Sequence, residues 1–384
     1  MANNLGLPAP RSWLAYISAG LGAAGLLGVL AFHFPDLLTS RDFRAAYSEQ
    51  FARGLLLFAL IVSFLSGTLA VLRQRSVRVA LAGVCLAASA TFLGGATIPV
   101  DYVRDTPFSL GLDWFVISLF FSALVFIPIE RRLAVRSLSP LRAEWRTDLA
   151  YFFVSHVLVQ FILIAVTAST TTVSALVLFP SIKATIQSWP VWLQFLLAVF
   201  CADLFQAGLH RIYHKVPFFW RFHAVHHSSR NLDWLAGSRV HFVEIVLTRS
   251  AVLLPLVVLG FSQSAVNAYV ILVGVQAVLA HANLRIDFGW LEYLLVTPRY
   301  HHWHHARHAD YVDVNYAIHL PLVDMIMGTF KRPPSKAWPD EYGVMKLETV
   351  PRGIWAQTLM PLGSRKTFTD HVGAMDVPGS APTR

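Results

Sequence analysis

The sequence predicts an all-α integral membrane protein with about eight transmembrane helices and a histidine-rich helical cap on the cytoplasmic side. Hydrophobic residues make up 55% of the 384 residues and charged residues only 14%, whereas soluble domains carry about 25% charged residues. Eight apolar runs approach the roughly 20 residues that a helix needs to cross a bilayer. Thirteen of the 16 histidines lie between His210 and His319.

The N-terminal third contains four of these apolar runs, at residues 13–33, 54–72, 79–99 and 111–129. The first run has about twenty apolar residues, which is longer than the h-region of a signal peptide, so we expect an uncleaved span. The third run carries small residues that allow close helix packing, namely Gly83, Ala87, Ala90 and Gly94. We predict an N-terminal four-span membrane region over residues 1–139.

Four further runs follow, at residues 149–168, 191–210, 243–260 and 263–281. They belong to a second predicted domain over residues 140–340, and residues 341–384 form a polar tail. Arginines fill the links 73–78 and 131–146, and cytoplasmic loops collect Lys and Arg. Eight spans with both termini in the cytoplasm satisfy these links. This orientation places the ends of the sixth and eighth spans, with the histidines beyond them, on the cytoplasmic side.

The histidines occur in three boxes, HRIYH, HAVHH and HHWHH, with a single histidine in HAN before the third. Residues three or four apart on a helix share a face, so the members of each box can point into one cavity. Imidazole binds iron, zinc, copper and nickel, and one such ion takes about four to six ligands. The sequence therefore predicts a polynuclear metal site formed by His210, His214, His223, His226, His227, His281, His301, His304 and His305.

Other functional classes fit the sequence less well. The two cysteines both lie in apolar runs, which argues against a disulfide framework. The net charge of +9 comes from loops beside the spans, as the positive-inside rule explains, so no nucleic-acid partner is predicted. A zinc protease would need His-Glu-x-x-His, which is absent. A metal transporter or sensor with histidine-rich loops stays open as an alternative, although such tracts are usually repetitive.

The three boxes and the runs around them resemble the pattern of the fatty acid hydroxylase/sterol desaturase superfamily. The matching runs include WRFHAVHHS, HAN, PRYHHWHH, DVNYA and DMIMGTF, and the resemblance covers roughly residues 140–335. It implies that residues 140–340 are a catalytic domain with two iron ions held by the nine histidines. It further implies an O2-dependent hydroxylase of a membrane lipid, with a desaturase on the same scaffold as the alternative.

The resemblance also bears on substrates and partners. Relatives act on ornithine-type membrane lipids, other acyl lipids, sterols, carotenoid rings and alkyl glycerol ethers, so the implied substrate is a membrane lipid whose class the sequence leaves open. No fused cytochrome b5 stretch is present, and a separate donor of the cytochrome b5 or ferredoxin type is expected. Ala317 and Val323 stand where the family usually has Gly and Trp, and neither change removes a ligand.

Two carboxylates near the boxes are candidates for catalytic or positioning roles. Asp203 lies within the sixth span, two turns before His210. An intramembrane carboxylate is a functional candidate by default, and we expect Asp203 to orient a ligand histidine. Glu244 follows His241 in a His-x-x-Glu pattern that the family often has at this place. We expect Glu244 to contact the metal or one of its ligands.

The segment after the third box carries further candidates. Asn315, together with Asp313, is expected to fix the third box rather than to touch substrate. His308 and His319 are either additional ligands or surface residues, and the sequence does not decide between these roles. The arginine-rich loop 131–146 would favour anionic lipid headgroups at the membrane surface.

Overall fold

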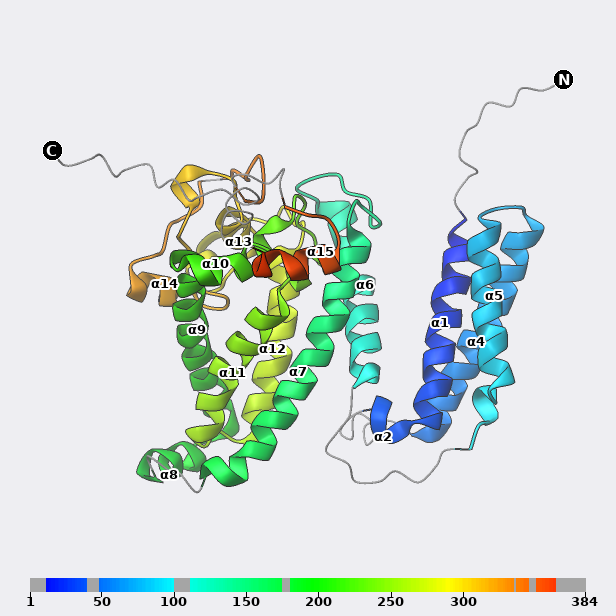
Figure 1. Cartoon of the computed structure of the whole chain (residues 1–384), viewed down its shortest axis with the longest axis horizontal. Coiled ribbons are helices and arrows are strands. Elements are labelled where there is room, and N and C mark those ends of the chain that lie inside the picture. Colours follow the sequence, from blue (N-terminus) through cyan, green and yellow to red (C-terminus); the bar gives the residue numbers. More distant parts are fainter. Residues whose placement is uncertain are drawn as a thin grey trace. The chain divides into compact units, whose positions relative to one another are not determined.

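The structure, a computed structural model, describes residues 12–39, 48–99, 111–174, 180–334, 336–344 and 350–363. Fourteen α-helices lie in these ranges, where the only β-type pairing is one bridge between Ala306 and Tyr342, which confirms the all-α class. The chain divides into two compact units, Met1–Leu119 and Phe120–Arg384 (Figure 1). Most of the polar tail, from residue 364 onward, is outside the described residues.

The first unit is built on three long helices that pack through small residues. Its helices are α1 (Trp13–His33), α2 (Pro35–Leu38), α4 (Glu49–Leu72) and α5 (Val77–Phe92). Gly83 of α5 lies so close to Ser18 of α1 that a Cβ would overlap the serine. Ser18 Oγ in turn donates to the carbonyl of Ser63 at 2.8 Å. Gly83, Ala87 and Ala90 are all buried, so the predicted close packing of this helix is confirmed.

The second unit combines a bundle of long helices with a cap of short ones (Figure 1). The bundle contains the end of α6 (Leu112–Leu133) and the helices α7 (Trp145–Ser174), α8 (Pro180–Ser188), α9 (Val191–Lys215), α11 (Phe242–Val258) and α12 (Gln263–His281). The cap contains α10 (Pro217–His223), α13 (Pro298–His304), α14 (Pro321–Met327) and α15 (Ile354–Leu359). The bundle core lies between α9, α11 and α12, where Ala202, Val252 and Tyr269 are fully buried.

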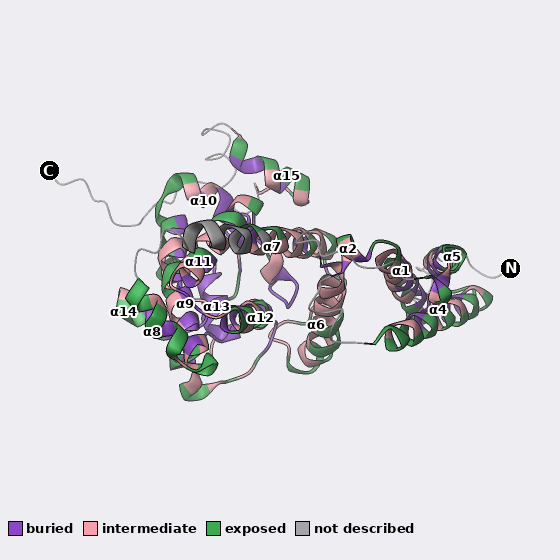
Figure 2. Cartoon of the chain, turned by 90° about the horizontal axis from the view of Figure 1, so that it is seen from below, coloured by how far each residue is buried: buried purple, intermediate pink, exposed green. Residues whose placement is uncertain are grey.

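Six helices among the described residues are long and apolar enough to cross a membrane: α1, α4, the stretch Val77–Thr97 that begins with α5, α6, α9 and α12. Many of their large apolar residues are exposed, and Figure 2 colours much of α4 and α5 as exposed. The eight predicted spans also included α7 and α11, which are helices at the predicted places but are not among the six. Helix α11 has only 17 residues and carries Glu244 and Arg249. Seventeen residues is the lower limit for a span.

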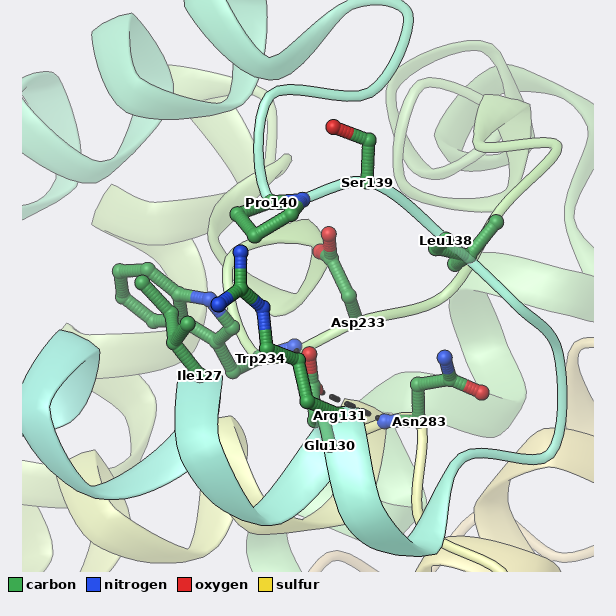
Figure 3. Close-up of a pocket in the computed structure, with 9 residues that line it drawn as sticks. All are labelled: Ile127, Glu130, Arg131, Leu138, Ser139, Pro140, Asp233, Trp234 and Asn283. Atoms are coloured by element: carbon green, nitrogen blue, oxygen red, sulfur yellow. Dashed lines mark hydrogen bonds between the residues drawn. The ribbon is translucent and has the colours of Figure 1, made fainter. Parts of the chain in front are cut away.

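A small pocket lies where the end of α6 meets the cap (Figure 3). Its lining includes Glu130, Trp234 and Asn283. Glu130 Oε1 accepts hydrogen bonds from the backbone N–H of Trp234 at 2.8 Å and of Asn283 at 2.9 Å. Asn283 Oδ1 then accepts from the backbone N–H of Val135 and Arg136, both at 3.0 Å. These contacts fasten α6 and the loop after it to the chain two residues beyond His281.

A buried ion-pair network holds the arginine-rich loop onto the cap. Arg142 pairs with Asp148 at 2.7 Å and with Asp233 at 2.6 Å. Arg239 pairs with Asp148 at 2.6 Å and with Glu144 at 2.9 Å. The side chains of Arg142 and Arg239 are almost fully buried, and these carboxylates raise the pKa of both guanidinium groups. Arg142 is therefore unavailable to lipid headgroups, whereas Arg131, Arg132 and Arg146 of the same loop are exposed.

Replacing Asp148 with Asn is expected to lower the free energy of unfolding by about 3–5 kcal/mol, because breaking a buried ion pair leaves an uncompensated charge. Two arginines lose their shared carboxylate in this variant. The loss is measured as a drop in the melting temperature of the detergent-solubilised protein. Glu144→Gln is the control, since the partly exposed Glu144 should contribute less than about 1 kcal/mol. Equal melting temperatures for the two variants would contradict the assignment.

Candidate metal centre

Nine buried histidines form two adjacent groups in the cap end of the second unit. Within each group, one ligand atom of every residue lies within 4.8 Å of the others, and none of the nine residues is more than 8% exposed. Together the groups contain all nine histidines that the sequence singled out. The first group is His210, His214, His223, His227 and His304, and the second is His226, His281, His301 and His305.

Helix ends bring these residues together. The last two turns of α9 carry His210 and His214 on the buried face, and α12 ends at His281. The HAVHH box spans the end of α10 and the short 3-10 helix η2 (His226–Ser228). The third box lies on α13, whose first turn is capped by the side chain of Thr297 and begins with Pro298. Both residues favour a helix start at this point.

The first group holds two imidazole nitrogens that face each other without a hydrogen between them. His210 Nδ1 lies 2.8 Å from the carbonyl oxygen of Tyr316. A carbonyl only accepts, so Nδ1 carries the hydrogen and Nε2 is bare. His223 Nδ1 donates in the same way to Glu244 Oε1 at 2.8 Å. The two bare Nε2 atoms are 3.1 Å apart, an arrangement that a shared cation would stabilise.

The second group repeats this arrangement. His281 Nδ1 donates to the carbonyl oxygen of Ala277 at 2.8 Å, which leaves its Nε2 bare. His301 Nε2 lies 3.0 Å from His281 Nε2 and 3.1 Å from His305 Nε2. His226 Nδ1 donates to the carbonyl oxygen of Arg239 at 3.0 Å. The ion-pair network around Arg239 therefore acts on this group through the backbone.

These donor sets fit metal ions. Imidazole nitrogens bind a divalent metal at about 2.1 Å, and two of them at right angles on one ion are about 3 Å apart. The Nε2–Nε2 distances of 3.0–3.1 Å match this spacing. His214 Nε2 and His304 Nε2 are buried and have no hydrogen-bond partner among the described residues. All-imidazole groups suit iron, zinc, copper or nickel rather than magnesium or calcium.

One loop, Asp313–Tyr316, contacts three histidines of the first group. Besides the bond from His210 to Tyr316, His304 Nδ1 donates to the carbonyl oxygen of Val314 at 2.8 Å. His214 Nδ1 lies 3.3 Å from Asp313 Oδ1. Outer contacts of this kind fix the tautomer and orientation of a ligand histidine. Sequence reasoning expected this segment to fix the third box, but two of its three contacts reach the first box.

Asp324 anchors that loop, and sequence reasoning gave it no role. Its carboxylate is fully buried and accepts hydrogen bonds from the backbone N–H of Tyr316 at 2.8 Å and of Ala317 at 2.7 Å. It also accepts from the hydroxyls of Tyr300 at 2.8 Å and Thr329 at 2.6 Å. Asp324 is the first residue of the run DMIMGTF, and the match of this run to the family pattern was the signal that could have identified it.

The three predicted catalytic residues lie around the histidines rather than among them. Glu244 contacts His223, as described above. Asp203 accepts from the backbone N–H of three consecutive residues, 318–320, at 2.6–3.2 Å. Sequence reasoning expected it to orient a histidine, whereas its carboxylate holds the chain that follows Tyr316. Asn315 has a left-handed backbone, with φ of 63°, and its side chain bonds the backbone of Lys331 in both directions.

The remaining histidines of this region have other positions. His308 is exposed, and its side chain caps the 3-10 helix η5 (Ala309–Tyr311). His241 caps the start of α11, and its other nitrogen bonds the carbonyl oxygen of Thr358 at 3.1 Å. His302 lies between Tyr342 Oη at 2.8 Å and the carbonyl oxygen of His281 at 3.2 Å. His319 is buried and belongs to neither group.

Burial keeps the cap histidines neutral. It lowers the pKa of His226 to about 4, and it lowers the pKa of His227, His304 and His305 well below the usual value, with a further decrease from neighbouring histidines. The pKa of His302, outside both groups, is also lowered to about 4 by burial. Neutral imidazole is the form that binds metal.

The metal-free protein is expected to lose stability as the pH falls from about 6.5 to about 4. A histidine with a lowered folded-state pKa binds a proton more weakly in the folded than in the unfolded chain, so its contribution is complete above 6.5 and is lost on acidification. For His302 and His226 the shift from 6.5 to about 4 corresponds to about 3 kcal/mol each. Melting temperatures measured across this range by circular dichroism check the prediction, and a flat profile would contradict it.

Comparisons with known proteins point to one family. The family model for fatty acid hydroxylases matches residues 195–329, which include all nine histidines. Ornithine lipid hydroxylase OlsE of Rhizobium tropici is 30% identical over 191 residues, which cover 48% of this chain and 55% of that protein. Alkylglycerol monooxygenase of Xenopus tropicalis is 31% identical over 142 residues, or 37% of this chain and 30% of that protein.

A very-long-chain aldehyde decarbonylase of Oryza sativa subsp. indica is 25% identical over 134 residues, or 32% of this chain and 21% of that protein. The chain thus spans about half the length of the ornithine lipid hydroxylase and less of the other two relatives. No solved structure matches the chain.

Proposed function

Because residues 195–329 belong to the fatty acid hydroxylase family, we propose that the chain is a di-iron, O2-dependent hydroxylase of a membrane lipid. The observation that carries this proposal is the pair of adjacent, fully imidazole donor groups, whose rings meet where His227 stacks on His305 with centroids 4.3 Å apart. Two groups so close together suit two metal ions that act on one substrate.

The first group would hold one iron and the second group the other. Bound iron supplies the activation of O2 and the oxidation of an unactivated C–H bond, chemistry that amino-acid side chains lack. The protein's own residues fix the orientation of the ligand histidines. Backbone carbonyls and Glu244 hold the Nδ1 hydrogens outward, so that Nε2 points into the site in His210, His223, His226 and His281. Burial of all nine rings keeps bulk water from the site.

The substrate is proposed to be a lipid on the strength of the named relatives, which are an ornithine lipid hydroxylase and an alkylglycerol monooxygenase. A desaturase is the alternative within this class, because both reactions can begin with the same hydrogen abstraction. A metal transporter or sensor is the alternative from another class. The outward hydrogen bonds that fix the histidines, together with their burial, favour a resident metal over one that is exchanged.

We further propose eight membrane crossings with the metal centre in the cytoplasm. Helices α6, α9 and α12 all end at the cap (Figure 1), where Glu130, His210 and His281 lie. The chain must return to the far end between them, and α7 and α11 are the helices that make these returns. Eight crossings and the arginine-rich loops then place the cap on the cytoplasmic side. A separate electron donor of the cytochrome b5 or ferredoxin type would approach the cap from there.

The deciding experiment measures metal content of the purified protein together with the lipids of cells that contain or lack it. Two irons per chain and a lipid heavier by one oxygen are expected. Two irons with a lipid lighter by two hydrogens would replace the hydroxylase with the desaturase. Zinc alone, with an unchanged lipid profile, would overturn the proposal in favour of the transporter or sensor.

A further inference from the structure

His319 is a buried histidine that belongs to neither metal group. Its side chain is 2% exposed, and neither ring nitrogen has a hydrogen-bond partner among the described residues. Its backbone N–H donates to Asp203, which fixes its place along the bundle. Asp203 precedes His210 by seven residues of helix α9, so it lies about 10 Å farther from the cap. His319 therefore belongs to a different part of the interior from the metal centre.

Two further polar side chains of this region, Tyr269 and Arg249, also carry a buried atom that has no hydrogen-bond partner among the described residues. The ring of Tyr269, on α12, packs edge-on against the His319 ring with centroids 5.8 Å apart. Tyr269 is fully buried, and its hydroxyl also has no partner among the residues that the structure describes. Arg249, on α11, has a buried Nη1 in the same state. Arg249 follows Ile245 by four residues and precedes Val252 by three, and both are buried in the same core cluster as Tyr269. It therefore shares the face of α11 that packs toward Tyr269. Burial, together with the positive charge of Arg249, lowers the pKa of His319 to about 4.

What these three groups share is the capacity to donate a hydrogen bond. A guanidinium donates only, a phenol hydroxyl donates readily, and a neutral imidazole carries one N–H. The nearby carboxylate of Asp203 is already bound by the backbone N–H groups of residues 318–320. Buried donors without an acceptor are unfavourable, above all a cationic one. The complementary ligand is an oxygen acceptor that enters from outside the protein.

We propose that Arg249, Tyr269 and His319 bind the acyl oxygen of the lipid substrate, either a carboxylate or an ester or amide carbonyl. This rests on the proposed function, since it assumes that the lipid reacts at the histidine groups. Between the two sites the buried face of α9 carries Ala207, which packs in an apolar cluster with Ala280 and Val296. A hydrocarbon segment of the substrate would bridge this stretch, so the three donors set which carbon reaches the metal centre.

The test is a binding measurement that needs no turnover. Purified, detergent-solubilised protein is titrated with hexadecanoate, with methyl hexadecanoate and with hexadecane, and the dissociation constants are compared. The oxygen-bearing probes are expected to bind more tightly than hexadecane. Tyr269→Phe removes only the unpartnered hydroxyl, and it should weaken binding of the oxygen-bearing probes about tenfold, the effect of one lost hydrogen bond. Binding of hexadecane and the metal content should not change.

Tyr311→Phe is the matched control, because the Tyr311 hydroxyl already donates to the carbonyl oxygen of Arg332 at 2.9 Å. This variant should bind all probes as the unaltered protein does. Tighter binding of hexadecanoate than of its ester, abolished in Arg249→Met, would identify the ligand as a carboxylate, and the reverse order would identify a carbonyl. Equal affinity for the three probes, or full affinity in Tyr269→Phe, would overturn the proposal.

The binding result is independent of the proposed reaction. A protein that binds the oxygen-bearing probes in the expected way but yields no altered lipid would retain this site and lose the hydroxylase assignment. If the protein hydroxylates a lipid but Tyr269→Phe has no effect on binding, the hydroxylase assignment would stand and the acyl-oxygen site would be lost.

Discussion

His304→Ala and His301→Ala are each expected to abolish turnover and to reduce the metal content from two ions toward one. The two residues lie one turn apart on α13 but belong to different groups, His304 to the first and His301 to the second. Each substitution removes one donor from a buried site whose other donors stay in place. Even the loss of an outer contact to a ligand costs 10–100-fold in metal affinity or activity, so we expect at least a hundredfold loss here.

The measurement is metal per chain by elemental analysis, with turnover assayed on the same preparation. His302→Gln is the control on the same helix, since His302 bonds Tyr342 and a backbone carbonyl and belongs to neither group. It should keep both metals, although removing a buried hydrogen bond should lower its melting temperature. Loss of both metals in His302→Gln, or full turnover in either alanine variant, would refute the grouping.

Asp324→Asn should lose activity, although the substitution leaves all nine proposed ligand histidines in the chain. Each oxygen of Asp324 accepts a backbone N–H and a hydroxyl. An amide would turn its own NH2 group toward two of these donors. Each donor left unpaired in a buried place costs about 1–3 kcal/mol, so the loop Asp313–Tyr316 should be released. The first group should then lose its metal, while the second group, whose His281 and His226 bond the carbonyl oxygens of Ala277 and Arg239 instead of that loop, keeps its own.

The readout is again metal content, which should approach one per chain, together with proteolysis of the loop. Asp310→Asn serves as the control, because Asp310 is an exposed carboxylate just before the same loop. It should retain both metals and full activity. A fully loaded and active Asp324→Asn protein would show that the loop is held by other contacts.

Much of this site could be predicted because ligand histidines obey local rules. Spacings of three and four residues identify a shared helix face, and all nine predicted histidines lie in the two groups. The division between the groups was not predictable. His226 and His227 are neighbours that enter different groups because they lie on a 3-10 helix, where successive side chains diverge by about 120°.

The contacts around the histidines were harder to predict for a different reason. Backbone carbonyls of Tyr316, Val314 and Arg239 hold ligand rings. Every residue has a backbone carbonyl, so such a contact cannot be recognised from the residue type. Asp203 was recognised as a buried functional carboxylate, but its partners are backbone N–H groups more than 100 residues away. Among the predicted spans, α11 stopped at 17 residues because Leu259 and Gly260 end the helix.

The two histidine groups are shared between distant parts of the chain, and this sets the order in which the protein can mature. The first group stays incomplete until His304 is made, and the second until His301 and His305 are made. A ribosome produces these residues only after every predicted span, so neither group can hold a metal with its full set of histidines before the predicted spans have been made. If the proposed iron and orientation hold, iron delivery is the last step of biogenesis, and iron starvation should leave an inserted apoprotein whose cap is accessible to cytoplasmic quality-control proteases.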